Sequence, residues 1–271
     1  VNVSRPFRAP GPRSRDPIHP AGLDIQLRRP HYRRRKSEMP SSLKAALEDL
    51  LRARRLVKDG PPLRGEDRRF DLLPTGIDSV DGLLGGGFPR GQLSEVHGPL
   101  SCGRTGLAIS LLARATGAGA LVAWVDPGDR FDPASAAESG LDLSRLFWLR
   151  GEPTARSLPR TLSALGTLLG SGLFELLVLD LAGLPVTEVR RLPAASWLRL
   201  QRTLEGSPAA LVLLADHHLA SSPGGISLAL TPARPVWSGT PGPGRLLRGL
   251  AAEARGRVSL RTASFQLQAS A

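Results

Sequence analysis

An eight-residue loop pattern, set between a strand-like and a helix-like stretch, constrains this chain more than any other feature. It matches G-x-x-x-x-G-K-[ST] at every fixed position except one, where Arg104 replaces the lysine. In such a loop, backbone N–H groups and the N-terminus of the following helix point at a phosphate. Arginine keeps the charge but is bulkier and forked, so the exchange is not conservative at this site. The pattern predicts a phosphate-binding geometry whose chemistry has lapsed. The candidate nucleotide-binding residues are Gly98, Pro99, Cys102, Gly103, Arg104, Thr105 and Asp180.

A magnesium ion is expected at this loop only if a nucleotide binds there. The Thr105 hydroxyl would then contact Mg²⁺, and the Asp180 carboxylate, at the end of an apolar strand, would hold its water shell. An aspartate that simply starts a turn after the strand is the alternative for Asp180.

No general base can be assigned with the same ease. The segment from Asp126 to Asp129 follows a buried strand, where a carboxylate could face the terminal phosphate. A positioned base contributes about 10²–10⁴-fold in rate, so its loss alone would cripple hydrolysis. Asp129 is a weak substitute, and a turn role is its alternative. We therefore predict no catalytic residue, and we expect a protein that is not an enzyme.

Other polar residues carry weaker signals. Adjacent His217 and His218 point in different directions, and no Cys or carboxylate set completes a metal site with them. Cys102 is expected to be a small filler within the loop. A basic run after Asp180 could meet DNA phosphates, its last three members having helix-compatible spacing, and a solvated helix face is the alternative. These DNA-binding candidates are Arg190, Arg191, Arg199 and Arg202.

Apolar runs alternate with segments of helical spacing along most of the chain. This alternation predicts an α/β fold, a mainly parallel sheet with helices on both faces. Strands are expected at 93–97, 120–125, 146–149, 176–180 and 209–214, helices at 105–116, 133–139, 158–170 and 194–204, and two or three further strands within 226–234 and 257–268.

The residues before the core differ in composition. The chain has a net charge of +12, and residues 1–38 are rich in arginine and proline. We predict a disordered basic tail at 1–40, an amphipathic helix at 41–60, a linker at 61–71 and the core domain at 72–271. The single methionine, Met39, leads to the hypothesis that translation starts there or that the leading segment is dispensable; a GTG start at Val1 is the alternative.

Composition limits the compartment and the partners. One cysteine excludes an intramolecular disulfide, and no apolar run approaches the roughly 20 residues that cross a bilayer, so we expect a cytoplasmic protein. The positive charge suggests nucleic acid as a partner, although most of it lies in the tail.

Several motifs together resemble the core of the RecA-like (P-loop) ATPase superfamily. The resemblance covers about residues 72–215 and implies ATP with Mg²⁺ as the cofactor of an intact site. The motifs that carry it are Leu73-Pro74-Thr75-Gly76, Asp81, Gly85-Gly86-Gly87, Pro89-Arg90-Gly91, Trp124-Val125-Asp126, Phe131-Asp132-Pro133 and Gly140-Leu141-Asp142-Leu143.

The departures from that superfamily bear on activity. Gly128 stands where the resemblance places the catalytic glutamate, and the polar residue that senses the γ-phosphate would align near His217. The interval from Asp180 to Asp216 is short for the first DNA-binding loop, and the second would map to 219–225, which has no Lys or Arg. From these departures we expect little or no ATP hydrolysis, no required cofactor, and a protein that does not act through filaments on DNA.

Among degenerate members, the chain is most similar to the ImuA family, accessory proteins of bacterial DNA-damage-induced (SOS) mutagenic translesion synthesis. That similarity implies three partners, the polymerase-like protein ImuB, an error-prone C-family DNA polymerase and RecA, with weak DNA contact. Two alternatives stay open: a DNA-dependent ATPase or recombinase paralogue, and a cell-division inhibitor of the SulA type.

Overall fold

The computed structural model describes residues 72–151, 158–220, 224–256 and 261–268. The predicted tail at 1–40, helix at 41–60 and linker at 61–71 lie outside the described residues, as does the start-site hypothesis for Met39. No helix in the described ranges is long and apolar enough to cross a membrane.

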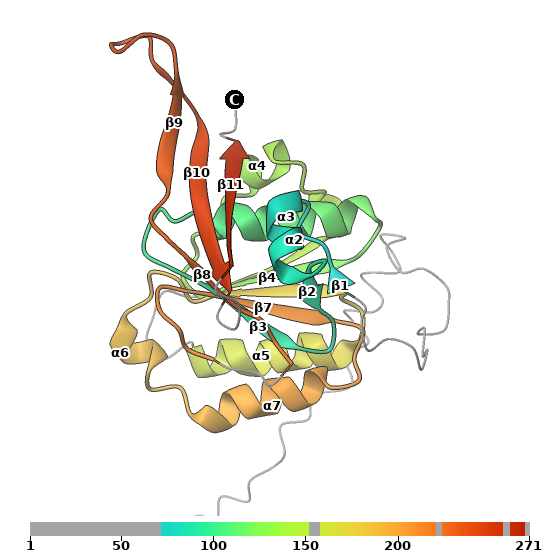
Figure 1. The fold of residues 1–271 in the computed structure, drawn as a ribbon. Helices are drawn as coiled ribbons and strands as arrows, with labels where there is room; N and C mark the ends of the chain where they lie inside the picture. Colours follow the sequence, from blue (N-terminus) through green and yellow to red (C-terminus); the bar gives the residue numbers. More distant parts are fainter. Residues whose placement is uncertain (1–71, 152–157, 221–223, 257–260, 269–271) are drawn as a thin grey trace, which may run out of the picture. The chain divides into compact units, whose positions relative to one another are not determined.

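A nine-stranded sheet forms the centre of the described chain (Figure 1). Its strand order is β11-β10-β8-β3-β7-β6-β4-β5, and β9 pairs with β10 off this path. Six neighbouring strands are parallel: β3 (Leu93–His97), β4 (Val122–Asp126), β5 (Leu146–Arg150), β6 (Leu176–Asp180), β7 (Ala210–Ala215) and β8 (Ser227–Leu230). The remaining three are antiparallel: β9 (Arg234–Ser238), β10 (Leu246–Gly256) and β11 (Thr262–Gln268). The expected mostly parallel α/β sheet is confirmed.

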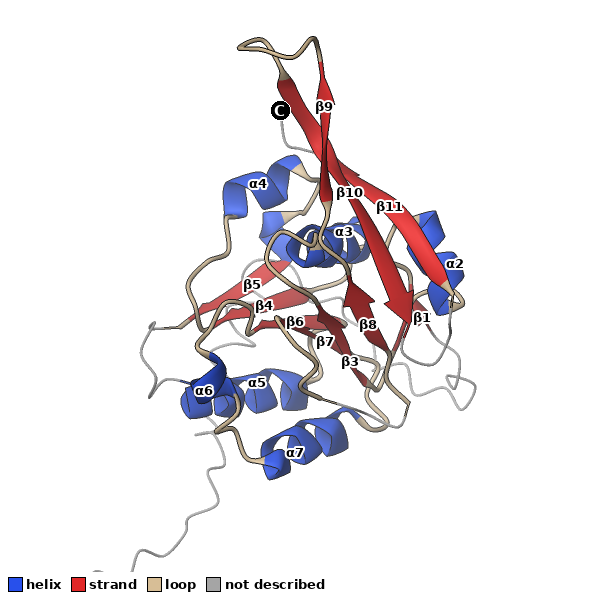
Figure 2. Ribbon diagram, turned by 60° about the vertical axis from the view of Figure 1, so that its left-hand side comes forward, coloured by secondary structure: helices blue, strands red, loops and turns tan. Residues whose placement is uncertain are grey.

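Helices cover both faces of this sheet (Figure 2). One apolar core lies between the sheet and α2 (Asp78–Leu84), α3 (Arg104–Gly117) and α4 (Pro133–Glu138). The other lies between the sheet and α5 (Leu158–Ser171), α6 (Val186–Val189) and α7 (Ala194–Leu204). A 3-10 turn, η2 (Leu143–Arg145), precedes β5. Because both faces are covered, β4, β6 and β7 are buried along their whole length and are almost entirely apolar up to their last residues.

The chain segment before the loop is held by a small side-chain network. A two-stranded sheet pairs β1 (Leu72–Leu73) with β2 (Phe88–Pro89). The Asp81 carboxylate accepts hydrogen bonds from Thr75 N at 2.7 Å and Thr75 Oγ1 at 2.8 Å. Ser110 of α3 donates to Thr75 O at 2.9 Å. Thr75 and Asp81 belong to the motifs that carry the family resemblance. Their hydrogen bonds connect the segment around Thr75 to α3, the helix that follows the loop.

The C-terminal part contains more strand than the sequence predicts. Strands were expected within 226–234 and 257–268, where β8 and β11 lie, but most of β9 and all of β10 fall between these ranges. The Leu, Ala, Arg and Glu content of β10 favours a helix in isolation. Antiparallel pairing with β8, β9 and β11 makes it a strand, so tertiary contacts override local preference here.

Candidate nucleotide-binding site

The loop from Gly98 to Thr105 joins β3 to α3, the position that the sequence predicts. Ser101 and Gly103 have positive φ angles of 60° and 91°, which turn the chain into the N-terminus of α3. A Cβ atom at Gly98 would lie 2.6 Å from the Leu230 carbonyl oxygen and 2.8 Å from Cys102 Sγ, so only glycine fits there. The backbone thus keeps the curvature of a phosphate-cradling loop.

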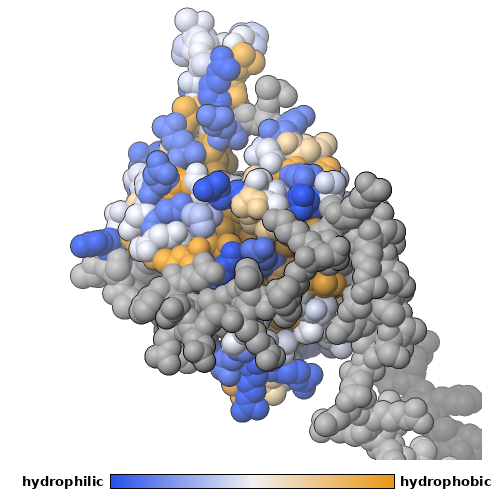
Figure 3. Space-filling model, turned by 90° about the vertical axis from the view of Figure 1, so that its right-hand side faces the viewer, coloured by the Kyte–Doolittle hydropathy of each residue, from blue (hydrophilic) through white to orange (hydrophobic). Residues whose placement is uncertain are grey.

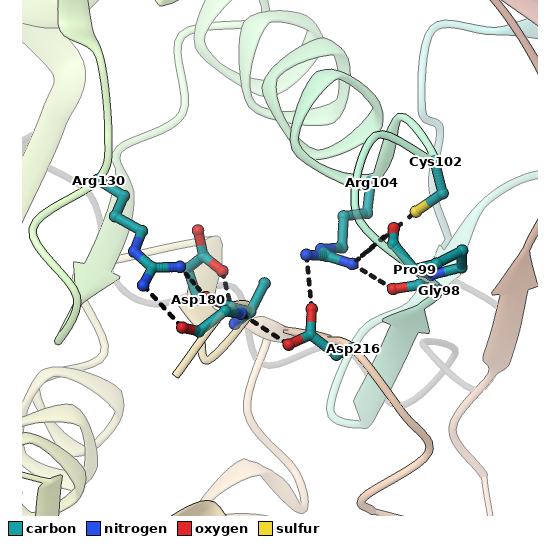
Figure 4. A network of polar contacts seen from close by, with 9 residues as sticks. Gly98, Pro99, Cys102, Arg104, Arg130, Asp180 and Asp216 are labelled. Atoms are coloured by element: carbon teal, nitrogen blue, oxygen red, sulfur yellow. Dashed lines mark hydrogen bonds and ion pairs between the residues drawn. The ribbon is translucent and has the colours of Figure 1, made fainter. Parts of the chain in front are cut away.

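Arg104 turns its guanidinium back onto this loop (Figure 4). Its Nη1 donates to the carbonyl oxygen of Gly98 and, at 3.0 Å, to that of Pro99, and it lies 4.0 Å from Cys102 Sγ. The residue is buried, with 6% of its surface exposed. Arg104 therefore serves as an internal partner of the loop, whereas a lysine at this position in an intact loop reaches a bound phosphate.

Asp216 neutralises this buried guanidinium. It directly follows β7, and its Oδ1 lies 2.7 Å from Arg104 Nη2. Its Oδ2 accepts a hydrogen bond from Gly183 N at 2.9 Å. The sequence analysis placed the γ-phosphate-sensing position near His217, but that side chain is exposed, and the residue that faces the loop is Asp216. The signal that could have found it is a carboxylate directly after a buried apolar strand.

Asp180 lies at the end of β6, between Arg130 and Arg104 (Figure 4). Burial raises the pKa of its carboxyl to about 6, and the nearby Asp126 charge adds to that increase. A hydrogen bond from Ala182 N and the charges of Arg104 and Arg130 act in the opposite direction. The side chain is placed where the sequence puts it, on the edge of the sheet that carries the loop, and burial makes its charged form costly.

Arg130 and Asp126 brace this edge, a role that the sequence analysis did not assign. Asp126 Oδ2 accepts hydrogen bonds from Arg130 N and Phe131 N, both at 2.8 Å. The Arg130 guanidinium donates to Ala182 O at 3.1 Å and Gly183 O at 2.7 Å. Together these bonds join the segment after β4 to the segment after β6.

Asp129 is occupied by a neighbouring arginine. It has a positive φ of 51° in the turn after β4, and both of its carboxylate oxygens accept from Arg150, each at 2.8 Å. The hydrogen bonds from Arg150 lower the pKa of Asp129 below its usual value. A carboxylate with a lowered pKa is a poor proton acceptor. Gly128 beside it offers no side chain at all.

Thr105 lies exposed near the start of α3, beside a pocket of about 400 Å³. The loop forms one wall of this pocket, and β10 and β11 form the other. Leu267 of β11 lies so close to the loop and to the first turn of α3 that a Cβ atom would come within 2.9 Å of its Cδ1 atom at Gly103 and within 2.7 Å at Gly106. Apolar side chains dominate the walls: Leu100, Leu247, Leu250 and Leu267. The surroundings of Thr105 thus suit apolar contact more than a hydrated metal ion.

The candidate DNA-binding arginines and His218 are the last residues that the sequence analysis singled out. Arg191 precedes α7, so it does not continue the helical row that the sequence suggested, whereas Arg199 and Arg202 lie on α7. All four arginines of the basic run are exposed. His218 contacts the buried Glu95 of β3, a carboxylate that the sequence analysis did not associate with it.

A mostly parallel sheet with helices on both faces, and a phosphate-type loop between β3 and α3, define an α/β domain of the P-loop class. A model of the RecA N-terminal domain family matches residues 61–196, half of the chain. The chain belongs to this family.

Individual relatives agree with that assignment. The RecA protein of Paenarthrobacter aurescens is 36% identical over 119 residues, which cover 43% of this chain and 33% of that protein. The RecA protein of Brucella anthropi is 35% identical over 146 residues, covering 51% of this chain and 38% of that protein. This chain thus matches little more than a third of these relatives. A crystal structure of the RadB recombinase has the same fold, with a TM-score of 0.53 at 23% identity over 72% of this chain and 96% of that one.

Proposed function

We propose that this chain is a non-recombinogenic accessory protein of the ImuA type, which acts in DNA-damage-induced mutagenic translesion synthesis through protein contacts. Little or no ATP hydrolysis accompanies that role, and no cofactor is required for it. The observation that carries the proposal is the Arg104 guanidinium, bonded to the carbonyls of its own loop and paired with Asp216 at 2.7 Å.

This arrangement opposes catalysis in two ways. A phosphate entering the loop would have to displace the Asp216 carboxylate from the guanidinium, and the freed Asp216 would then repel it. The hydrolytic step would in addition lack a base, since residue 128 is glycine and Asp129 is held by Arg150. A positioned base contributes about 10²–10⁴-fold in rate, so the second defect alone makes turnover slow.

The C-terminal hairpin supports a role in protein contact. The β9–β10 hairpin projects beyond the other strands of the sheet in Figure 1, forming an arm, and Figure 3 shows apolar and hydrophilic residues interleaved along this arm at the top of the view. Trp237, Leu246 and Leu247 on this arm are exposed by 42%, 59% and 44%. Exposed large apolar side chains that gather on one projection are typical of a docking surface. The partners that we propose are ImuB, an error-prone C-family DNA polymerase and RecA.

Weak DNA contact is a secondary part of the proposal. The exposed arginines on and before α7 and the basic residues 1–38 are the candidates for it. Deleting residues 1–38 should weaken nonspecific binding and flatten its dependence on salt, because each lost phosphate contact reduces the slope. An unchanged slope would exclude the tail as the DNA-contacting part.

A nucleotide experiment separates this proposal from the DNA-dependent ATPase or recombinase alternative, which family membership and the loop backbone favour. The purified chain is titrated with a fluorescent ATP analogue and Mg²⁺, and phosphate release is followed with single-stranded DNA. We expect no turnover above background. A rate of about 0.1 s⁻¹ or more, abolished by Asp180→Ala, would reject the accessory role, since typical enzymes turn over at about 1–10³ s⁻¹.

A binding experiment separates the translesion role from cell-division inhibition. Immobilised protein is offered ImuB and, in parallel, the tubulin-like division GTPase. Retention of ImuB is the expected result. Tight binding of the GTPase with no retention of ImuB would favour the SulA-type alternative.

A further inference from the structure

A second group of chemistry-bearing side chains lies just before the phosphate-type loop. Glu95 and His97 are two residues apart on β3, so they share one face of the sheet. His218 follows β7, the parallel neighbour of β3, and its ring meets Glu95. The three residues therefore come from two strand ends that the topology brings side by side.

Glu95 is held firmly within this group. It is 1% exposed, and its Oε1 accepts hydrogen bonds from Leu219 N at 2.6 Å and Ala220 N at 3.3 Å. Its Oε2 lies 2.5 Å from His218 Nδ1. One carboxylate oxygen is thus committed to the backbone of the segment after β7, and the other faces the imidazole.

The two imidazoles lie near enough to share one ion with this carboxylate. The ring centroids of His97 and His218 are 5.7 Å apart, with their planes inclined by 54°. One ligand atom from each of the three residues falls within 4.8 Å of the others. Ligand atoms about 2.0–2.1 Å from a tetrahedral zinc ion lie roughly 3.4 Å from one another. The atoms that lie up to 4.8 Å apart must therefore approach by about an ångström or more, and Glu95 Oε2 and His218 Nδ1, 2.5 Å apart, must separate by about an ångström. The His218 side chain, 37% exposed, has room for these movements.

Two imidazoles and one carboxylate form a donor set for borderline divalent metals. His₂Glu with an open fourth position is an established set for zinc, and imidazole suits zinc, cobalt and nickel better than magnesium or calcium. A carboxylate that also accepts backbone hydrogen bonds is fixed in orientation, as the carboxylate partners of metal sites are.

We propose that Glu95, His97 and His218 bind a divalent cation of the zinc class, with water in the remaining position. The ion would replace the direct contact between Glu95 Oε2 and His218 Nδ1. It would also connect His97, which precedes Gly98 of the loop, to the segment that carries Asp216. This site is separate from the Mg²⁺ position considered for Thr105 and Asp180, and it does not depend on the proposed accessory function.

The test uses the full chain without an affinity tag, stripped of metal by chelation. Calorimetry with Zn²⁺ and the visible absorption of Co²⁺ report the binding. We expect one ion per chain and a tetrahedral Co²⁺ spectrum. His97→Gln and His218→Gln should each weaken binding at least about 10-fold, the effect that even indirect partners of a metal site produce. Glu95→Gln should do the same, provided that circular dichroism shows it to be folded.

The other histidines of the chain supply a matched control. A triple variant that replaces His19, His31 and His217 by Gln keeps only the two proposed imidazoles. It should bind like the wild type, and His217→Gln alone should have no effect although it adjoins His218. The proposal is overturned if the triple variant loses the ion, if His97→Gln and His218→Gln bind as tightly as the wild type, or if the Co²⁺ spectrum stays that of the hydrated ion.

Discussion

Arg104 of the phosphate-type loop forms an ion pair with Asp216, with 2.7 Å between Arg104 Nη2 and Asp216 Oδ1. The arginine side chain is buried and the aspartate side chain is partly exposed. Arg104 begins α3 and Asp216 follows β7, so the pair connects the loop to the next parallel strand of the sheet. The guanidinium also contacts two loop carbonyls, so both Nη1 and Nη2 have protein acceptors. These contacts hold the loop through protein groups alone.

Breaking this pair should destabilise the fold. Asp216→Asn removes the charge but keeps an oxygen for Gly183 N, so the guanidinium is left buried beside carbonyls alone. Removing one partner of a fully buried pair costs about 3–5 kcal/mol. Asp216 is 24% exposed, so we expect a smaller loss, about 1–3 kcal/mol in the free energy of unfolding. Urea denaturation measures it.

A double-mutant cycle assigns that loss to the pair. Arg104→Met and Asp216→Asn should each destabilise, while the double variant should be less destabilised than their sum by at least about 1 kcal/mol, because residues in contact do not act additively. Strict additivity would mean that the two side chains do not stabilise one another.

The buried Asp180 predicts a stability effect that depends on pH. Its pKa is raised from 3.8 to about 6, so the folded state prefers the protonated form. The wild type therefore loses stability as the pH rises from about 4 through 6, and the full penalty, of the order of 3 kcal/mol, applies above that range. Asp180→Asn cannot ionise and keeps the acceptor for Ala182 N. We expect this variant to be more stable than the wild type at pH 8, by up to that amount.

Unfolding curves at pH 8 and pH 4 check this expectation. The difference between variant and wild type should shrink to a small fraction of its pH 8 value at the lower pH, where Asp180 is protonated in the folded state and close to half protonated in the unfolded state. A difference of the same size at both values would mean that the substitution acts through packing and not through charge.

The fold could be predicted from sequence wherever burial made a simple pattern. β4, β6 and β7 are apolar along nearly all of their length because both faces of the sheet are covered, and α7 runs over Ala194–Leu204 as its spacing predicts. β10 was not predicted because its composition favours a helix. Its strand conformation depends on pairing with β9, which precedes it across a Gly- and Pro-rich turn, and with β11, which follows it in the chain.

The site could be predicted only in part. The loop motif placed Arg104 and Asp180 on one edge of the sheet, since parallel strands end together there. The partners of Arg104 could not be read from the motif, because the Asp216 contact depends on how the chain turns after β7. Glu95 lies within the predicted strand 93–97, and its neighbours in the sequence give no sign of its contact with His218. That contact could not be predicted, because His218 lies 123 positions away along the chain.

Under the proposed accessory role, efficient hydrolysis should require two substitutions together. Arg104→Lys removes the forked contact with Asp216 and should tighten binding of an ATP analogue, but it supplies no base. Adding Gly128→Glu is sterically tolerable, as a Cβ atom there would lie 3.4 Å from Arg130 Nε and 3.5 Å from Leu184 Cδ2. We expect the double variant to release phosphate at least about 100-fold faster than Arg104→Lys alone.

The control for this pair replaces Gly128 by Gln in the Arg104→Lys background. Glutamine has the same size as glutamate but cannot accept the proton, so phosphate release should stay at background. Equal rates for the Gln and Glu variants, or turnover by Arg104→Lys alone, would contradict the explanation that a missing base limits this site.

Apolar residues on the β9–β10 hairpin should decide partner binding. Leu246→Thr with Leu247→Thr removes two exposed apolar side chains and keeps a residue type that suits strands. Covering each leucine contributes about 1.5–3 kcal/mol, so the double variant should bind ImuB at least about 100-fold more weakly. Its own stability should change by less than about 0.5 kcal/mol per site, as is usual for surface substitutions.

Leu198→Gln on α7, where the leucine is 48% exposed, is the matched control and should bind ImuB normally. Titration by surface plasmon resonance distinguishes these outcomes, and equal weakening by the α7 variant would place the docking surface outside the hairpin.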